Sequence, residues 1–376
     1  MSGETDSSGG SDTSDTPDTA DTTEPATAVA PPTPLRQRIQ EVGLLVVGLL
    51  GLFMIGFIVL DWLRTLPGSV GGLAAGGFGQ FLLVGAWMDF YLGTNVFRHP
   101  FMWRAIATGV LVGIVGPLVG TYLVHRQMAL IGETLAHTAF AGVAIGIVVI
   151  GALGVSGSGG QLVFVALIVS IIAALGLQWL VEHTDSYGDV PIAIVLTGSF
   201  AVGTLLISWG RSFVSVPIDI EDFLFGDLAI VTADGARLVA VLSVVVVGLV
   251  AYNYKQFLFI TFDEKAARVA RLRVRWYNAL LVVLTAIVVV GAMQILGVIL
   301  VAGLLVIPVA AASQVAQGFR ETLYLSVLFG QASIIAGIGV SIWQGLPSGG
   351  SVIVVAIGIY LTATVVSDRS PVLSQS

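Results

Sequence analysis

Residues 277–316, YNALLVVLTAIVVVGAMQILGVILVAGLLVIPVAAASQVA, decide the fold class of this chain. The stretch carries no charged residue, and it is about twice as long as the 20 residues that a helix needs to cross the hydrocarbon core of a bilayer. It therefore predicts two membrane helices that meet near Gly297, or one long helix followed by a broken one. Either arrangement makes the chain an integral membrane protein.

The composition extends this interpretation to the whole chain. Of its 376 residues, 56% are hydrophobic and 10% are charged, whereas soluble domains carry about 25% charged residues. The apolar runs predict an all-α, polytopic membrane protein of about ten transmembrane helices. The Gly-rich stretch 69–88 is a re-entrant segment, an interfacial helix or a poor span. The expected spans are 42–62, 105–124, 129–151, 161–181, 191–208, 237–254, 277–296, 298–316, 322–343 and 351–367.

The net charge of −7 resides in the N-terminal tail. Residues 1–34 hold seven acidic residues and no Lys or Arg. The tail is rich in Ser, Thr, Asp and Pro and has no aromatic residue, so we expect it to be disordered. It lacks the basic start and the short apolar core of a signal peptide. Cysteine is absent from the chain, which excludes disulfides, cysteine-based metal sites and thiol chemistry.

The basic residues predict the orientation in the membrane. They are densest at 255–275, which holds six Lys and Arg, and the positive-inside rule places that loop in the cytoplasm. Counting spans from this loop gives a multi-pass plasma-membrane protein with both termini in the cytoplasm. In this scheme Arg64, Arg98 and Arg104 fall on the outer side. If 69–88 crosses the membrane, the N-terminus lies outside instead.

The stretch IGETLAHTAFAGVAIG (131–146) places a carboxylate and an imidazole one helical turn apart. Glu133 and His137 share one helix face. Ionisable groups inside membrane helices are costly unless they face a pathway or a partner, and this pair suits a divalent cation such as zinc or manganese. The alternative is a helix-end pair that only anchors packing. Gly132 and Gly142 let neighbouring helices approach closely.

The other polar groups are weaker candidates for a site. His99, His125 and His183 are interpreted as solvated residues at membrane boundaries or in loops. An acidic group at 219–227 attracts cations or docks a partner in one interpretation, and is a solvated surface in the other. Its members are Asp219, Glu221, Asp222 and Asp227.

The sequence excludes a P-loop ATPase. A phosphate-binding P-loop needs Gly-Lys followed by Ser or Thr, and the only two lysines follow Tyr254 and Glu264. ATP-driven transport would therefore need a separate ATPase subunit. An HExxH motif, paired intramembrane Asp residues and a nucleophile–base constellation are also absent, so the chain is not predicted to be an enzyme.

The segment TFDEKAARVARLRVRW (261–276) predicts a short charged helix on the cytoplasmic side. Ala266, Ala267 and Ala270 give it a face of small residues, which fits a groove on a partner protein. The alternative is an ordinary loop whose basic residues only set the orientation.

Four segments resemble, in the same order, the membrane permeases of zinc- and manganese-type metal ABC importers. Together they cover about residues 100–367, and two of them, with Thr-Leu-Ala-His and Leu-Phe-Gly-Asp-Leu, are most similar to the zinc-uptake members. The segments are FMWRAIATGVLVGIVGPLVGTYLVHRQMALIGETLAHTAFAGVAIG (101–146), FLFGDLAIVTADG (223–235), the 263–276 loop followed by MQILGVILVAGLLVIPVAAAS (293–313), and LPSGGSVIVVA (346–356).

The resemblance implies a fold related to that of the vitamin B12 and siderophore importers. It implies an assembly of two copies of this permease, two ABC ATPase subunits and an extracytoplasmic metal-binding protein. Membrane lipid surrounds the assembly, and nucleic acid is not a partner. No cofactor is bound permanently, because Zn²⁺ or Mn²⁺ is the transported substrate.

By position, the resemblance makes Glu133 and His137 candidate metal-path residues. It makes the 261–276 loop the ATPase-coupling element, with Asp263, Ala267 and Arg271 at its patterned positions. Family members usually have Asp in place of Glu133 and Gly in place of Arg271. Four further residues are predicted to shape helix packing along the pathway: Gly132, Gly142, Gly297 and Pro308.

The predicted function is the permease subunit of an ATP-dependent divalent-metal importer, with zinc as the favoured metal. The alternatives are an importer of manganese, iron or a metal chelate, a secondary metal transporter or channel, and a non-transport membrane scaffold. The expected divisions are a disordered acidic tail at 1–34, an additional N-terminal helix with the Gly-rich segment at 35–100, the metal ABC permease domain at 101–367 and a C-terminal tail at 368–376.

Overall fold

A computed structural model describes most of the chain. The described residues are 34–153, 159–183, 190–210, 224–226, 231–298 and 301–369. Two features singled out in the sequence lie outside these ranges: residues 1–33 of the acidic tail, and the acidic group Asp219, Glu221, Asp222 and Asp227.

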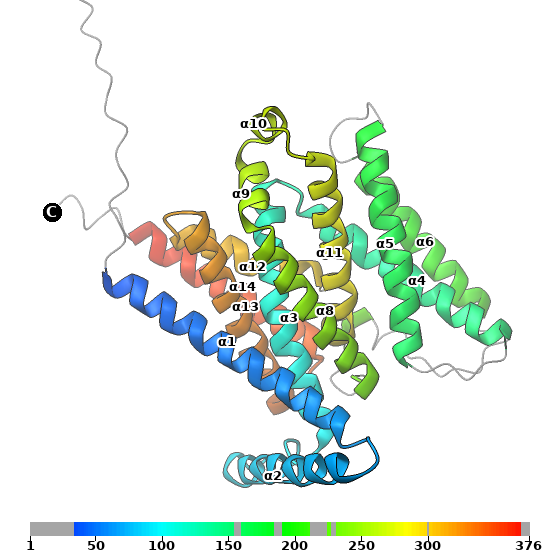
Figure 1. Ribbon diagram of the computed structural model, residues 1–376, viewed down its shortest axis with the longest axis vertical. Coiled ribbons are helices and arrows are strands. Elements are labelled where there is room, and N and C mark those ends of the chain that lie inside the picture. Colours follow the sequence, from blue (N-terminus) through cyan, green and yellow to red (C-terminus); the bar gives the residue numbers. More distant parts are fainter. Residues whose placement is uncertain are drawn as a thin grey trace, which may run out of the picture.

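Every regular element in the described ranges is a helix, which confirms the all-α fold class (Figure 1). By length and hydropathy, nine of these helices could span a membrane, and α5 and α12 contain shorter apolar segments. The helices are α1 (Pro34–Leu63), α2 (Ser69–Leu92), α3 (Pro100–His125), α4 (Leu130–Leu153), α5 (Gly159–His183), α6 (Val190–Gly210), α8 (Ala233–Tyr252), α9 (Tyr254–Phe262), α10 (Glu264–Val269), α11 (Val274–Leu296), α12 (Val301–Val315), α13 (Phe319–Gln344) and α14 (Ser348–Arg369).

Helix α3 is the centre of the bundle. Of its most apolar window, 83% is buried, and it contacts α1, α8, α11, α12 and α13. A Cβ atom on Gly120 would lie 1.9 Å from the carbonyl oxygen of Leu305, so only glycine allows α12 to approach this closely. The hydroxyl groups of Thr121 and Ser326 are 2.9 Å apart and join α3 to α13.

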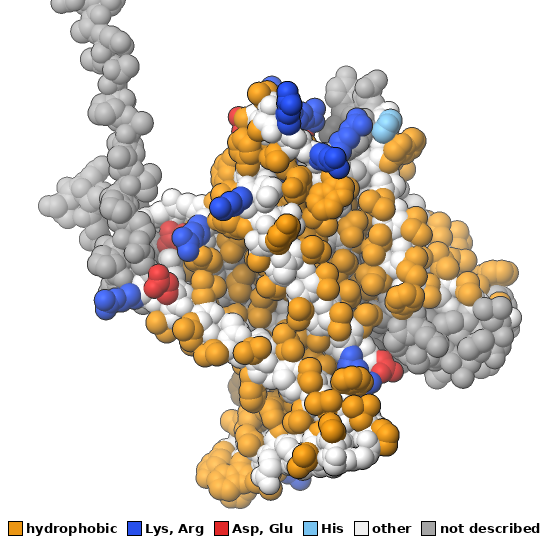
Figure 2. Space-filling view, viewed as in Figure 1, with side chains coloured by type: hydrophobic (Ala, Val, Ile, Leu, Met, Phe, Trp, Pro, Cys, Tyr) orange, Lys and Arg blue, Asp and Glu red, His pale blue; other side chains and the backbone are white. Residues whose placement is uncertain are grey.

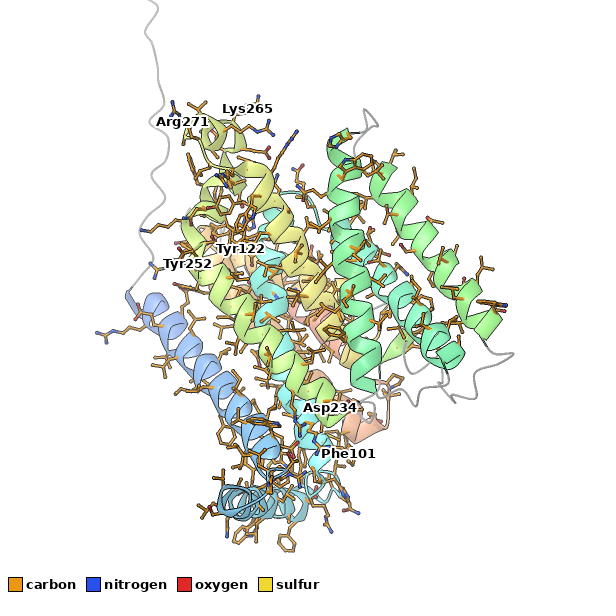
Figure 3. The ribbon with its side chains drawn as sticks, turned by 45° about the vertical axis from the view of Figure 1, so that its right-hand side comes forward. Phe101, Tyr122, Asp234, Tyr252, Lys265 and Arg271 are labelled. Atoms are coloured by element: carbon orange, nitrogen blue, oxygen red, sulfur yellow. The ribbon has the colours of Figure 1, made fainter. Side chains whose placement is uncertain are left out.

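Helix α2 lies across one end of the bundle, at a steep angle to α1 and α3, in both Figure 1 and Figure 3. Only 22% of its apolar window is buried. The end of α1 contacts the start of α3, so α2 does not carry the chain across the bundle. Although α2 is long and apolar enough to span, this placement agrees with the interfacial alternative for 69–88.

Two buried aspartates hold α1 and α2 onto this end of the bundle. Asp61 of α1 accepts hydrogen bonds from Arg104 Nε of α3 at 2.9 Å and from Arg64 Nε at 2.7 Å. Asp89 of α2 pairs with Arg98 at 3.3 Å and also accepts three backbone N–H groups of the loop that leads into α3. The three arginines that the orientation scheme placed outside therefore each have a carboxylate partner.

The surface of the bundle has an apolar flank and a basic end. Figure 2 shows apolar side chains over the flank of the bundle, and Lys and Arg gathered at the end formed by α9, α10 and α11. Large apolar residues of α6 and α14, such as Leu205 and Val354, are 69% exposed each. Such a surface is stable only against the acyl chains of lipid or another protein.

Removing the charge of Asp61 tests the anchoring of α1. The variant Asp61→Asn leaves Arg104, which is 19% exposed, without its carboxylate, so we expect a loss of about 1–3 kcal/mol of stability. Thermal unfolding of the detergent-purified protein measures it. The matched control is Asp234→Asn, which breaks the exposed Asp234–Arg237 pair and is expected to cost at most about 0.5 kcal/mol. Equal effects of the two variants would contradict the anchoring role.

The position of α2 can be tested because the chain contains no cysteine. We expect a nitroxide attached to Leu73→Cys to be more accessible to oxygen than to a water-soluble nickel complex, because Leu73 is 81% exposed on an apolar helix. Leu205→Cys on α6 is the lipid reference, and Val269→Cys on α10 is the water reference. A Leu73 probe that matches the Val269 probe would show that α2 lies in water.

Candidate functional site

Helix α4 carries the carboxylate–imidazole pair predicted from the sequence. Glu133 lies in its first turn, where the positive end of the helix dipole favours a carboxylate. His137 follows one turn later, and both side chains are half-buried. The pair therefore lies on one face of a helix that packs against α5, α6, α11 and α12.

The imidazole of His137 has an unsatisfied nitrogen. Its ring meets the edge of Phe200 of α6 at a centroid distance of 5.1 Å and an interplanar angle of 83°. Its Nδ1 atom is buried and has no hydrogen-bond partner among the described residues. A buried polar atom without a partner is costly, and it is available to a ligand that the chain itself does not supply.

The other histidines differ from His137 in this respect. His125 Nδ1 is 2.8 Å from the carbonyl oxygen of Thr121, and His183 Nδ1 is 2.9 Å from that of Trp179. The His99 ring stacks on Phe101, 5.7 Å away. The structure therefore provides contacts for these three rings, and it leaves a buried ring nitrogen without a partner only at His137 among the described histidines.

Glycines hold the helices close around the pair. A Cβ on Gly132 would lie 2.9 Å from Leu305 Cδ1 of α12, and one on Gly142 would lie 2.9 Å from the Cα atom of Ala166 of α5. Both predicted packing glycines are thus at close helix contacts. A larger residue at position 142 would push α5 away from the helix that carries Glu133 and His137, because the close atom there belongs to the backbone. At position 132 the side chain of Leu305 would have to move.

The pair offers two ligands rather than a closed metal site. Within the described ranges, no group of three or more His, Asp or Glu side chains is arranged to hold a metal ion. A structural zinc site has four ligands and a catalytic one has three from the protein. Two donors from one chain are therefore suited to brief contact with a passing ion, with the remaining ligands supplied by water or another chain.

Within residues 277–316, α11 ends at Leu296 and α12 begins at Val301, so the described residues form two helices on either side of Gly297, as one of the two sequence alternatives predicted. Gly297 has φ +72°, and a Cβ there would lie 2.3 Å from the carbonyl oxygen of Leu224. Only glycine satisfies both the positive φ and this close approach. Pro308 is buried inside α12.

The predicted coupling element at 261–276 contains the end of α9, all of α10 and the start of α11. Asp263 is the N-cap of α10 and accepts a hydrogen bond from the Ala266 backbone N–H at 2.8 Å. Ala267 is fully buried against Ile260 and Val274. The short helix is thus fixed to α9 and α11 by its cap and by one small buried side chain.

The end of α10 explains why the family pattern usually has glycine at the position of Arg271. Leu272 N–H donates to Ala267 O at 3.1 Å and Arg271 N–H donates to Arg268 O at 3.0 Å, which is a Schellman motif. Its C′ residue is Arg271, with φ +58°. Glycine is the residue that adopts this conformation without strain, so the usual Gly of the family pattern has a backbone reason.

The sequence did not reveal two parts of this arrangement. Phe200 lies on another helix from His137, and only the fold brings them together. Arg126, in the turn between α3 and α4, contacts residues of the coupling element, and its only signal in the sequence was its position in a basic turn.

Comparison with known proteins places these features in a family. The profile of the ABC 3 transport family matches residues 98–367, from just before α3 to near the end of α14. The manganese transport system membrane protein MntC of Listeria monocytogenes is 30% identical over 279 residues, which cover 74% of this chain and 95% of the relative. The high-affinity zinc uptake system membrane protein ZnuB of Haemophilus influenzae is 24% identical over 269 residues, covering 71% and 98%.

Solved structures agree with this match. PsaBC from Streptococcus pneumoniae, solved in complex with a Fab, is 27% identical with a TM-score of 0.61, and the match covers 71% of this chain and 91% of that chain. An inward-facing metal-chelate type ABC transporter is 15% identical with a TM-score of 0.52 over 69% and 84% of the two chains, and it supports the fold alone. These similarities do not separate zinc from manganese.

Substituting Arg271 tests the strained end of α10. We expect Arg271→Gly to stabilise the protein by about 1 kcal/mol, because a left-handed conformation costs a residue with a Cβ about that much. Arg271→Ala removes the same charge and keeps the Cβ, so it should give no such gain. Thermal unfolding of both variants decides, and an equal gain from both would show that charge, rather than backbone strain, is responsible.

Proposed function

This chain belongs to the ABC 3 transport family, and we propose that it is the membrane permease of an ATP-driven importer of Zn²⁺ or Mn²⁺. The observation that carries this proposal is the pair of Glu133 and His137, with a buried imidazole nitrogen that no described residue satisfies. A carboxylate and an imidazole are suitable ligands for either ion.

The energy for transport is proposed to come from a separate subunit, because the sequence lacks a P-loop. The end of the bundle with α10 is suited to contact it. Figure 3 places Lys265 and Arg271 at that extremity, at the opposite end of the bundle from Phe101 and Asp234. A hollow of ≈ 330 Å³ beside α10 is lined by Arg271, Leu272, Arg273, Trp276 and Tyr277, which offers a basic and aromatic surface to a partner.

The proposed assembly has two copies of the permease, two ATPase subunits and an extracytoplasmic metal-binding protein. In this proposal, the α10 end faces the cytoplasm and both termini lie on that side. ATP binding and hydrolysis by the partner move α10 and change which side of the membrane can reach the pathway between the permease copies. This is the alternating access that the family resemblance implies.

The ligand pair makes the passage of an ion feasible without trapping it. An ion that leaves water needs replacement ligands, and a complete protein shell would hold it too tightly for release. Glu133 supplies an anionic oxygen and His137 supplies a neutral nitrogen, while water or the second copy completes the coordination.

The choice of metal depends on details that the pair itself does not determine. The Thr-Leu-Ala-His and Leu-Phe-Gly-Asp-Leu motifs favour zinc, whereas the relative MntC is named as a manganese transport protein. We retain zinc as the expected substrate and manganese as its competitor. Metal-stimulated ATP hydrolysis by the permease–ATPase complex, measured across Zn²⁺, Mn²⁺ and Fe²⁺, ranks them.

Substituting the two ligands tests the proposed pathway. We expect Glu133→Ala and His137→Ala each to abolish metal uptake by the assembled complex, because either change leaves the ion with one protein ligand. The matched control is His183→Ala, which removes an exposed histidine that stacks on Trp179. The control should transport at the wild-type rate, with radioactive metal uptake into vesicles as the measurement. Normal uptake by both ligand variants would remove the pair from the mechanism.

A further inference from the structure

We propose that Arg126 transmits movement of α10 to α4, so that it couples the ATPase partner to the metal-path residues. This inference rests on the proposed function, and it assigns a positioning role to a residue that the sequence did not single out. Arg126 lies in the turn between α3 and α4, yet its side chain reaches α10 and α11.

The guanidinium of Arg126 contacts one residue of the coupling element, Glu264 of α10, and one residue just beyond it, Asn278 of α11. It donates from Nη2 to Asn278 Oδ1 of α11 at 2.7 Å, and the same nitrogen is 3.6 Å from Glu264 Oε2 of α10. Its side chain is only 8% exposed, whereas that of Glu264 is 38% exposed. A buried cation with these two partners ties the α3–α4 turn to α10 and α11 at one point.

The positive charge of Arg126 makes it costly for this side chain to lose its partners. Burial lowers the pKa of Arg126, while the negative charge of Glu264 opposes that shift. The guanidinium remains protonated in proteins and presents its donors in a fixed plane. Because the cation cannot neutralise itself, it must follow its partners when α10 moves or lose the interactions that compensate its burial.

A short, structured turn connects Arg126 to the metal-path helix. Gln127 has φ +57°, and the Met128 N–H donates to Leu123 O at 2.8 Å, which closes a Schellman motif at the end of α3. Helix α4 begins at Leu130, and Glu133 lies in its first turn. A displacement of Arg126 is therefore applied directly to the end of α4 that carries the ligand pair.

Aromatic contacts hold the same turn against two further helices. The His125 ring meets the edge of Phe319 of α13 at a centroid distance of 4.9 Å, and Phe319 in turn contacts Phe262 of α9 at 5.6 Å. One turn earlier, Tyr122 packs on Phe257 of α9 at 5.5 Å. These contacts hold the end of α3 against α9 and α13, and the Arg126 contact joins the turn that follows to α10.

Glu264 has two basic neighbours, which provides a matched comparison. Its Oε2 faces buried Arg126, and its Oε1 bonds to Arg268 within α10, whose side chain is 68% exposed. The Arg126 contact connects α10 to the α3–α4 turn, and the Arg268 contact remains inside α10. If transmission depends on the connection, losing Arg126 matters and losing Arg268 does not.

The test uses the permease–ATPase complex in vesicles, supplied with the metal that stimulates the wild type. We expect Arg126→Gln and Glu264→Gln to lower the number of metal ions moved per ATP hydrolysed by about five-fold or more, while ATP hydrolysis without metal continues. Arg126→Lys, which keeps the charge but not the planar fork, should recover only part of this ratio. Arg268→Gln should leave the ratio unchanged. Because Arg268 lies on the end of the bundle that is proposed to contact the ATPase, every ratio is measured on complexes that contain the ATPase at the wild-type stoichiometry.

The outcomes distinguish this inference from the function on which it rests. If the wild-type complex moves no metal, the proposed function fails. If the wild type works and Arg126→Gln keeps the wild-type ratio, or Arg268→Gln lowers it equally, the role of Arg126 is overturned. If the Arg126→Gln permease does not assemble with the ATPase, the Glu264→Gln variant decides, because Glu264 is half-exposed and its substitution keeps the hydrogen bond between Arg126 and Asn278. A wild-type ratio of metal ions to ATP in that variant overturns the proposal, and a lowered ratio supports it.

Discussion

The structure depends on the rule that hydrocarbon offers no hydrogen-bond partner, so buried polar groups must find partners inside the protein. Asp61 meets two arginines at the junction of α1 and α3, and Thr121 meets Ser326 across the α3–α13 contact. Among the described residues, the buried Nδ1 of His137 is one of seven buried side-chain nitrogen or oxygen atoms without a hydrogen-bond partner. His137 also lies one helical turn from the carboxylate of Glu133, and this combination makes it the candidate ligand for a group from outside the chain.

Hydropathy predicted the helices because a span must be long and apolar whatever packs against it. The shared face of Glu133 and His137 followed from helical periodicity alone. Contacts between distant residues were not predictable: Arg126 and Asn278 are 152 positions apart. The path of α2 was ambiguous because an apolar stretch of that length can either span the membrane or lie flat on it. The contact between Asp61 of α1 and Arg104 of α3 keeps the two helices that flank α2 together at one end of the bundle, and the sequence of α2 itself does not contain this information.

The helices that precede the family match contact other helices than the ligand-bearing helix α4 does. Helices α1 and α2 precede the region that matches the family, and α1 contacts α2, α3, α8 and α13. Helix α4 contacts α5, α6, α11 and α12 instead. Helix α1 therefore packs on the central helix α3 and not extensively on the helix that carries the ligand pair. The proposed working part runs from α10 through the α3–α4 turn to α4.

Metal uptake into liposomes that contain this chain with and without its ATPase partner tests the central claim most directly. The account predicts no uptake of Zn²⁺ or Mn²⁺ by the chain alone, and ATP-dependent uptake when the ATPase is present, because the sequence has no P-loop and two ligands cannot drive an ion uphill. Equal uptake by the chain alone would contradict it and would identify a secondary transporter or a channel.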